Sequence, residues 1–357
     1  MLRGLCAVGL AALVGMAAPA TAQSDDRIEE DGTVRLDGVE VPLSSFLSEE
    51  GRDYLRHIIV DKPFGSAVPD IEEERVRQDG LMAAFLKPMR ERYAVDIAED
   101  RIGGVVVDVV TPAEGIAPEN ADRLLINVHG GGFTTGGRSA SLVESVPLAA
   151  LMKIKVVSID YRMAPEYRFP AASEDVEAVY RELLQSYDAD KIGLYGCSAG
   201  GVLAAQSVAW FQAHDLPAPG ALGVFCASLG GYFGGDATMT AGPLNGYLPP
   251  IDPPPATDAP PPPGYLDEAD PSDPLVYPLA SDAVMGQFPP TLFISGTRSF
   301  EFSAALNSHN ALARVGVESR LHGWDAMFHG FIYNSELPEA REAYDIMVDF
   351  FQTHLAD

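Results

Sequence analysis

The amino-acid sequence predicts an α/β fold, in which helices cover both faces of a mostly parallel β-sheet. From residue 101 onward, short runs rich in β-branched and aromatic residues alternate with longer stretches of helical periodicity. The short runs are apolar throughout instead of alternating between apolar and polar, which is typical of strands buried on both faces. Parallel strands need long crossover connections, and the helical stretches supply them.

Seven strands and five helices are predicted in this part of the chain. The strands are expected at residues 104–110, 124–128, 156–159, 192–195, 221–225, 291–294 and 318–321, and the helices at 142–152, 173–186, 199–213, 303–315 and 338–354. Up to about residue 99 the chain is rich in charged residues with helical spacing, most clearly over residues 71–93. The predicted organisation is a helical N-terminal region, residues 23–100, followed by a sheet domain, residues 101–357.

Residues 1–22 have the composition of a secretory signal peptide. Arg3 is their one positive side chain, residues 5–18 form an apolar stretch too short to span a bilayer comfortably, and residues 20–22 offer small side chains to a signal peptidase. We therefore expect cleavage of this segment and an exported protein, periplasmic or secreted. The alternative is an N-terminal membrane anchor, but no stop-transfer pattern follows.

Residues 230–287 break the alternation of strands and helices and hold nearly half of the chain's 28 prolines. The proline runs at residues 249–250, 253–255 and 260–263 cannot continue a helix or a central strand, so an extended, semi-rigid conformation is expected. The segment is either a surface linker or part of a lid over an active site, because long insertions at strand ends commonly shape pockets.

The charge of the chain excludes one class of function. The sequence has 24 Lys and Arg against 51 Asp and Glu, a formal net charge of −27, while 47% of its residues are hydrophobic. The hydrophobic fraction is that of a globular protein. An acidic chain without a basic cluster repels nucleic acids and anionic membrane surfaces, so we expect no nucleic-acid partner.

Cysteine and histidine usage is sparse. Outside the signal segment the chain has two cysteines, Cys197 and Cys226, which are expected to be small core residues with no predicted bridge between them. The seven histidines show neither an H-E-x-x-H pair nor cysteine partners at ligand spacing. No metal site is predicted.

The first motif with chemical content is Gly-Cys-Ser-Ala-Gly at residues 196–200, where a predicted strand ends and a predicted helix begins. Glycines on either side allow a sharp turn that exposes the central residue, Ser198, above the sheet. Ser198 also precedes the N-terminus of the helix, whose dipole favours a developing negative charge. We predict that Ser198 is a nucleophile.

The second motif, His129 followed by three glycines at residues 130–132, comes directly after an apolar strand. Glycines let backbone N–H groups approach a ligand closely, which the tetrahedral oxyanion of acyl transfer requires. A phosphate-binding loop is excluded because neither phosphate-loop pattern is present. His129 is interpreted as a structural hydrogen-bonding residue and not as a catalytic base.

The third motif places His329 in the sequence Phe-His-Gly-Phe, after the last predicted strand. A serine nucleophile needs a base that takes its proton and returns it to the leaving group, and imidazole has a suitable pKa. His309 and His322 are competitors, but the first lies inside a predicted helix and the second in the strand. We therefore predict that His329 is the base.

Together these motifs resemble the hormone-sensitive-lipase-like branch of the α/β-hydrolase esterases, from about Val106 to the C-terminus. The resemblance rests on residues 129–132, on Asp-Tyr-Arg-Met-Ala-Pro-Glu at 160–166 with Phe-Pro-Ala-Ala at 169–172, on residues 196–200, and on His-Gly-Phe at 329–331. It implies an α/β-hydrolase fold with an eight-stranded, mostly parallel sheet and no cofactor. It also implies a helical cap built from the N-terminal segment and the insertion at about residues 230–287.

The resemblance assigns further residues to the site. The family's oxyanion donors correspond to the backbone N–H groups of Gly131, Gly132 and Ala199. Asp160 and Glu166 are expected to tie loops beneath the site without taking part in the chemistry.

The sequence departs from the family at the third member of the triad. The family usually has an aspartate after its seventh strand, and Ser299 occupies that position here. A serine can accept the imidazole N–H but cannot stabilise an imidazolium with a full negative charge, so Ser299 is interpreted as structural. Glu301, two residues on, is the leading candidate for the acid. Asp325, and a site without an effective acid, remain open alternatives.

The predicted function is a serine carboxylesterase that hydrolyses short- to medium-chain esters through an acyl-enzyme at Ser198, with His329 as base and Glu301 as acid. Two alternatives remain: a non-catalytic ligand-binding protein on a decayed hydrolase scaffold, and a lactonase or acyltransferase that uses the same site. The expected partner is a small-molecule ester. We expect no stable membrane insertion after signal cleavage, and we allow for a homodimer.

Overall fold

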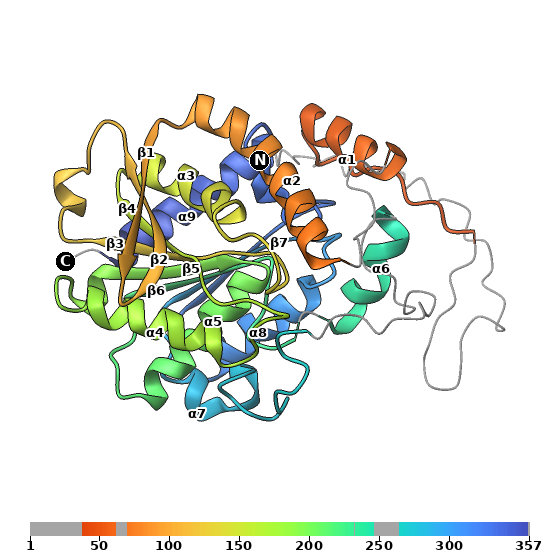
Figure 1. Ribbon diagram of the computed structural model, residues 1–357. Helices are drawn as coiled ribbons and strands as arrows, with labels where there is room; N and C mark the ends of the chain where they lie inside the picture. The colour runs from red at the N-terminus through yellow and green to blue at the C-terminus, as the bar shows by residue number, and fades with distance from the viewer. Residues whose placement is uncertain (1–37, 62–69, 232, 246–263, 356–357) are drawn as a thin grey trace, which may run out of the picture. The chain divides into compact units, whose positions relative to one another are not determined.

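An eight-stranded sheet forms the centre of the unit Leu43–Asp357 (Figure 1). The computed structural model describes residues 38–61, 70–231, 233–245 and 264–355. The strands are β1 Val95–Ile102, β2 Val105–Pro112, β3 Leu124–Val128, β4 Lys155–Ile159, β5 Ile192–Cys197, β6 Ala221–Phe225, β7 Thr291–Gly296 and β8 Ser319–Trp324. Their order is β1-β2-β4-β3-β5-β6-β7-β8, and only β2 runs antiparallel to its two neighbours. The predicted eight-stranded, mostly parallel sheet is confirmed.

Helices cover both faces of this sheet. The helices α3 Ala140–Met152 and α9 Pro338–His354 pack on one face, and α4 Ala171–Leu183, α5 Ala199–Ala213 and α8 Phe302–Arg314 pack on the other (Figure 1). The short helix α7 Asp282–Met285 contacts α5 and α8. The five predicted crossover and C-terminal helices are all present, within a few residues of their expected bounds.

Successive side chains of a central strand serve opposite layers. In β3, Leu125 packs in the cluster with α3 and α9, whereas Leu124 and Ile126 pack in the cluster with α4 and α5. All three side chains are fully buried, and burying each stabilises the fold by about 1.5–3 kcal/mol. Burial on both faces explains why the strand sequences are apolar throughout.

Three further helices come from the N-terminal segment and from the insertion between β6 and β7. They are α1 Glu49–Asp61, α2 Ile71–Arg92 and α6 Gly235–Asn245 (Figure 1). The helix α1 contacts α6 and α9, and α2 contacts α3. These helices occupy the parts of the chain in which a cap was expected.

Local sequence explains where α2 begins and ends. The Asp70 side chain accepts hydrogen bonds from the backbone N–H groups of Glu72 and Glu73, both at 3.0 Å, and so caps the first turn. Acidic residues in the first turn, and Arg90 and Arg92 in the last, complement the helix dipole.

The start of the sheet corrects one prediction. Helical structure was expected up to about residue 99, but β1 begins at Val95 and pairs antiparallel with β2 along its whole length, with Val95 opposite Pro112. As an edge strand, β1 is largely exposed and carries charged residues such as Glu99 and Asp100. The sequence of a solvated edge strand therefore resembles that of a polar helix. The sheet begins at residue 95 instead of 101.

The insertion corrects a second prediction. An extended conformation was expected over residues 230–287, but α6 and α7 within it are helical. Helix-starting residues flank the proline runs: Asp236 lies in the first turn of α6, and the Ser281 side chain caps α7 by accepting from the Val284 N–H at 3.3 Å. The proline runs at 249–263 and the predicted signal segment 1–22 lie outside the described residues. No helix in the described part of the chain is both long and apolar enough to cross a bilayer.

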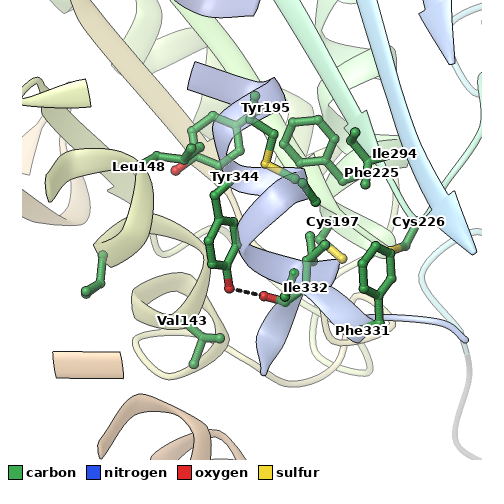
Figure 2. Packing of buried hydrophobic residues seen from close by; sticks show 14 of the residues in the cluster. Val143, Leu148, Tyr195, Cys197, Phe225, Cys226, Ile294, Phe331, Ile332 and Tyr344 are labelled. Atoms are coloured by element: carbon green, nitrogen blue, oxygen red, sulfur yellow. Dashed lines mark hydrogen bonds between the residues drawn. The ribbon is translucent and has the colours of Figure 1, made fainter. Parts of the chain in front are cut away.

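The core behind the ends of β5 and β6 holds both cysteines. Figure 2 shows Cys197 and Cys226 packed among aromatic side chains, with Phe225 at the end of β6 and Tyr344 on α9. The Tyr344 hydroxyl donates to the backbone carbonyl of Ile332, as the dashed line in Figure 2 marks. Both thiols are free and buried, as expected of small core residues.

Candidate active site

Ser198, His329 and Glu301 form a continuous hydrogen-bonded chain. The Oγ of Ser198 lies 2.9 Å from Nε2 of His329, and Nδ1 of the same ring lies 3.0 Å from Oε2 of Glu301. Because an ionised carboxylate can only accept, the Nδ1 proton points to Glu301 and Nε2 accepts the serine proton. The three residues follow β5, β8 and β7, whose carboxyl ends lie at one edge of the sheet.

Two serines hold the Glu301 carboxylate, which is fully buried. Ser295 Oγ donates to Oε1 at 2.9 Å, and Ser299 Oγ donates to Oε2, the oxygen that also faces His329. Ser299 is the residue for which the resemblance implies an aspartate. Its hydroxyl therefore supports a carboxylate that arrives from two residues further along the same loop.

The surroundings of Glu301 keep it charged. Burial alone would raise the pKa of this carboxyl, but the facing imidazole of His329 and the hydroxyl of Ser299 hold the pKa below its ordinary value. A carboxylate that is ionised at neutral pH is the species that can stabilise an imidazolium.

Asp325, the other candidate acid, has different partners. Its side chain is exposed and accepts hydrogen bonds from the Ser44 hydroxyl and from Thr297 Oγ1, the latter at 3.1 Å. Of the two candidate carboxylates, Glu301 is the one bonded to His329.

Ser198 sits in the strained turn that its motif predicts. Its φ of 57° and ψ of −125° place it in a region that residues with a side chain rarely adopt. A Cβ atom at Gly200 would lie 1.9 Å from the carbonyl oxygen of Val128, so only glycine lets the turn approach β3. The turn presents the hydroxyl of Ser198 at the N-terminus of α5.

The glycine loop after β3 faces the same cavity as Ser198. Gly131 has a φ of +119°, and a Cβ atom there would lie 2.2 Å from the carbonyl oxygen of Thr135. Within the described ranges, the N–H groups of Gly131, Gly132 and Ala199 donate to no protein acceptor. Donors left available beside a nucleophile are what a tetrahedral oxyanion needs.

His129 contributes to the shape of this loop. Its ring is fully buried, stacks on Tyr161 with centroids 4.3 Å apart, and places Nδ1 2.8 Å from the carbonyl oxygen of Gly130. Burial lowers the pKa of His129 to about 4, so the ring is neutral and Nδ1–H donates. These contacts match the structural hydrogen-bonding residue expected at this position.

Glu166 joins α2 to the loops around the site. It accepts two hydrogen bonds from Arg75, at 2.8 and 2.7 Å. Arg75 also donates to the carbonyl oxygens of Thr134, at 3.0 Å, and Ala164, at 3.2 Å. One guanidinium thus connects α2 with the glycine loop and with residues 160–166.

Asp160 lies beside the other end of the glycine loop. Its carboxylate is so close to Gly137 that a Cβ atom there would lie 2.6 Å from Oδ1. Burial raises the pKa of this carboxyl. Neither Asp160 nor Glu166 is among the residues that line the cavity.

The cavity above Ser198 and His329 has a volume of about 300 Å³. One wall of the cavity is a face of α2, formed by Glu74, Gln78 and Met82 at successive turns. Gln78 donates to Glu74 at 3.0 Å, so the wall is polar at one end and apolar at the other.

One group of side chains has the spacing of metal ligands. Among the described residues, Cys226, Glu301 and His329 offer ligand atoms that lie within 4.8 Å of one another. Glu301 and His329 already bond each other, and the sulfur of Cys226 accepts the N–H of Gly330 at 3.4 Å. Hydrogen bonds therefore account for this arrangement without an ion.

Sequence reasoning missed two parts of the site. Ser295 belongs to an apolar strand sequence and gave no signal of its own. The wall made by Glu74, Gln78 and Met82 did leave a signal, since residues i, i+4 and i+8 of a helix share one face, but nothing in the sequence indicated what that face would meet.

A family model described as an alpha/beta hydrolase fold matches residues 125–333, which is more than half of the chain. The matched segment includes Ser198, Glu301 and His329. Among curated proteins, an acetyl-hydrolase from Streptomyces hygroscopicus is 30% identical over 274 residues, which is 73% of this chain and 89% of that protein. An esterase from Acinetobacter venetianus is 27% identical over 242 residues, 66% of this chain and 76% of that protein.

Solved structures agree with this match. The crystal structure of an esterase named E25 has a TM-score of 0.74 at 29% identity and covers 90% of this chain and 99% of its own. An esterase from the bacterial hormone-sensitive lipase family has a TM-score of 0.72 at 23% identity, covers 85% of this chain and 98% of its own, and supports the fold.

Proposed function

We propose that this chain, which belongs to the α/β-hydrolase family and is an ester hydrolase, is a serine carboxylesterase acting through an acyl-enzyme at Ser198. We further propose that it belongs to the hormone-sensitive-lipase-like branch of that family. The observation that carries the proposal is the hydrogen-bonded chain from Ser198 through His329 to Glu301, at 2.9 and 3.0 Å. That chain has a nucleophile, a base and a charged orienting group in the order that acyl transfer requires.

In the first step, His329 Nε2 takes the hydroxyl proton as Ser198 Oγ attacks the ester carbonyl carbon. The imidazolium that forms faces the buried carboxylate of Glu301, which stabilises its positive charge. The negative charge that develops on the carbonyl oxygen is met by the N–H groups of Gly131, Gly132 and Ala199.

The tetrahedral intermediate collapses when His329 gives its proton to the departing alkoxide. An alcohol leaves and the acyl group stays on Ser198. Water then attacks the acyl-enzyme with His329 again as the base, and the carboxylic acid and free Ser198 are regenerated. Esters are favoured over amides because an alkoxide leaves more readily than an amine.

The cavity supports a short acyl chain. A volume of about 300 Å³ lies at the small end of the range for small-molecule sites. Glu74 and Gln78 add hydrogen-bonding groups to the wall that a long alkyl chain would have to cover. We propose that turnover is fastest for acetyl and butyryl esters and falls for octanoyl esters.

The test uses the full chain with p-nitrophenyl acetate, butyrate and octanoate. Ser198→Ala should reduce kcat by about 10⁴-fold or more, while Ser272→Ala, at an exposed serine in a turn, should leave kcat unchanged. A fluorophosphonate should label the wild type at Ser198. A wild type with neither turnover nor labelling would leave the ligand-binding protein as the better explanation.

Product analysis separates the remaining alternatives. A lactonase would open a cyclic ester faster than it hydrolyses p-nitrophenyl acetate, and an acyltransferase would give a new ester when an alcohol is added. We further propose an exported protein, on the composition of residues 1–22. The homodimer remains a prediction, which light scattering can check.

A further inference from the structure

A second buried carboxylate lies behind the loops of the site. Glu144, on α3, is 8% exposed and is not part of the chain from serine to acid. Its Oε1 accepts from the N–H of Gly130 at 2.8 Å and from the hydroxyl of Tyr333 at 2.7 Å. Its Oε2 accepts from the side-chain amide of Asn127 at 2.8 Å and from the N–H of Cys197 at 3.2 Å. One carboxylate thus receives four hydrogen bonds.

Three of these donors border a group of the proposed mechanism. Gly130 immediately precedes the glycines that hold the oxyanion, in the loop after β3. Cys197 immediately precedes Ser198, at the end of β5. Tyr333 belongs to the 3₁₀ helix Phe331–Tyr333, which begins two residues after His329 in the loop that follows β8. Glu144 is therefore bonded to all three loops that must meet for acyl transfer.

The segments around this carboxylate are in close contact. A Cβ atom at Gly130 would lie 2.6 Å from the hydroxyl of Tyr333 and 2.7 Å from the carbonyl oxygen of Cys197. Neighbouring side chains of α3 hold the helix in place: Figure 2 shows Val143 and Leu148 packed in the core that contains Cys197. A change in the carboxylate is therefore expected to shift these loops.

All four bonds to Glu144 come from neutral groups. Burial raises the pKa of its carboxyl to about 7, although the hydroxyl of Tyr333, the backbone N–H groups and the amide of Asn127 act in the opposite direction. Each donor would be left unsatisfied if the carboxylate were removed, at a cost of about 1–3 kcal/mol per buried group.

We propose that Glu144 is a positioning residue of the site, which sets the relative placement of the oxyanion donors, the nucleophile and the base through Gly130, Cys197 and Tyr333. The proposal rests on the proposed esterase function. It distinguishes Glu144 from a buried residue that only stabilises the fold. A residue that sets geometry changes the rate of chemistry in the folded protein, whereas a residue that only stabilises changes how much protein is folded.

The test is the Glu144→Gln variant, assayed with p-nitrophenyl acetate after its folded fraction has been measured by circular dichroism. The glutamine side chain has nearly the volume of the glutamate but carries an NH₂ donor in place of one acceptor oxygen. It therefore loses the hydrogen bonds that this oxygen accepted. We expect kcat per folded molecule to fall by about 10- to 100-fold with KM changed less than about threefold, because sub-ångström misplacement in a preorganised site costs rate. The rate of inactivation by a fluorophosphonate should fall in parallel, since it uses the same donors.

The matched control is Glu339→Gln. Glu339 is also a glutamate with 8% exposure, and it accepts two hydrogen bonds, from the backbone and hydroxyl of Ser48 at 2.7 and 2.9 Å. It does not line the cavity. We expect this variant to lower the melting temperature and to leave kcat unchanged. If Glu144→Gln also lowers only the melting temperature, the proposal is wrong.

A milder variant covers the case in which Glu144→Gln does not fold. Tyr333→Phe removes one of the four bonds and keeps the ring that lines the cavity. It should lower kcat about 3- to 10-fold, the size expected for the loss of a single hydrogen bond, and an unchanged kcat would overturn the proposal. Failure of the proposed function is distinguishable, because the wild type itself would then be inactive.

Discussion

Two buried glutamates, Glu301 and Glu144, occupy opposite situations in the same molecule. Both are nearly or fully buried, and both are held by several hydrogen bonds. Glu301 faces an imidazole that can become positively charged, and its pKa lies below the ordinary value. Glu144 faces neutral donors, and its pKa is raised to about 7.

Burial by itself does not decide what a carboxylate does. The neutral donors around Glu144 do not offset the free-energy cost of ionising its buried carboxyl. Glu144 is therefore suited to accepting hydrogen bonds and holding loops in place. A partner that can carry positive charge reverses the balance at Glu301, which suits it to stabilise an imidazolium.

The largest effect is expected at Glu301. Glu301→Gln keeps the shape of the side chain but removes its charge and offers a donor to His329, so the imidazole can adopt the wrong tautomer. We expect kcat for p-nitrophenyl acetate to fall by about 10³- to 10⁴-fold. A turnover within about tenfold of the wild type would contradict the role of Glu301 as the acid.

The second prediction moves the carboxylate to the position where the family usually has it. The double variant Ser299→Asp with Glu301→Ser should recover at least about tenfold of the activity lost in Glu301→Gln, because a charged group again faces His329. Ser299→Asp alone should lower kcat at neutral pH, because it adds a second buried negative charge beside Glu301. A gain in kcat for the single variant would mean that Glu301 is not an effective acid.

The third prediction concerns the pH dependence of stability, which should have opposite signs at the two sites. The depressed pKa of Glu301 contributes stability that is present above pH 4.5, the ordinary value, and is lost as the pH falls through the folded-state pKa. The raised pKa of Glu144 means that ionisation costs stability, so the free energy of unfolding falls as the pH rises from 4.5 to about 7.

Thermal unfolding of matched variants measures this difference. From pH 4 to pH 7, the wild type should become more stable relative to Glu301→Gln, so the difference between their melting temperatures should increase. Over the same range, the wild type should lose up to roughly 3 kcal/mol of unfolding free energy relative to Glu144→Gln. The hydroxyls and thiols around Glu144, on Tyr333 and Cys197, have raised pKa values and stay neutral over this range. If the stability of the wild type relative to both variants changed with pH in the same direction, the contrast between the two glutamates would be wrong.

The smallest effect is expected at Asp325, the carboxylate that lies in the loop of His329 but does not bond it. Asp325→Asn should leave kcat within about twofold of the wild type. Its exposed bonds to Ser44 and Thr297 should contribute less than about 1 kcal/mol to stability. A loss of activity comparable to that of Glu301→Gln would reopen Asp325 as the acid.

The sequence predicted the parallel core of the sheet well, because a strand buried on both faces has a composition that no solvated element shares. It missed β1, the edge strand, because exposed charged residues carry no periodic signal that separates a strand from a helix. It also missed α6, whose short helical sequence stands beside proline runs. In both cases the local pattern was weak and tertiary contacts selected the conformation.

The sequence motifs indicated most of the site, because the chemistry requires particular residue types next to one another. These motifs hold Ser198, His129 with its three glycines, and His329. The sequence left the acid open among Glu301, Asp325 and no acid. That choice depends on which side chain reaches His329 Nδ1, and a distance across two loops is set only when β7 and β8 pair. Pairing of these two strands places Oε2 of Glu301 3.0 Å from Nδ1 of His329.

The fold class, the motifs of the site and the acidic character of the chain follow from the sequence alone. Only folding brings one carboxylate to the imidazole and Ser299 to that carboxylate. Only folding also lets Glu144 bond three loops, one of which holds Tyr333, 189 positions further along the chain. The physical reason is that residue types and short-range patterns are encoded locally. The charge state and partners of a buried group depend on segments that only folding brings together.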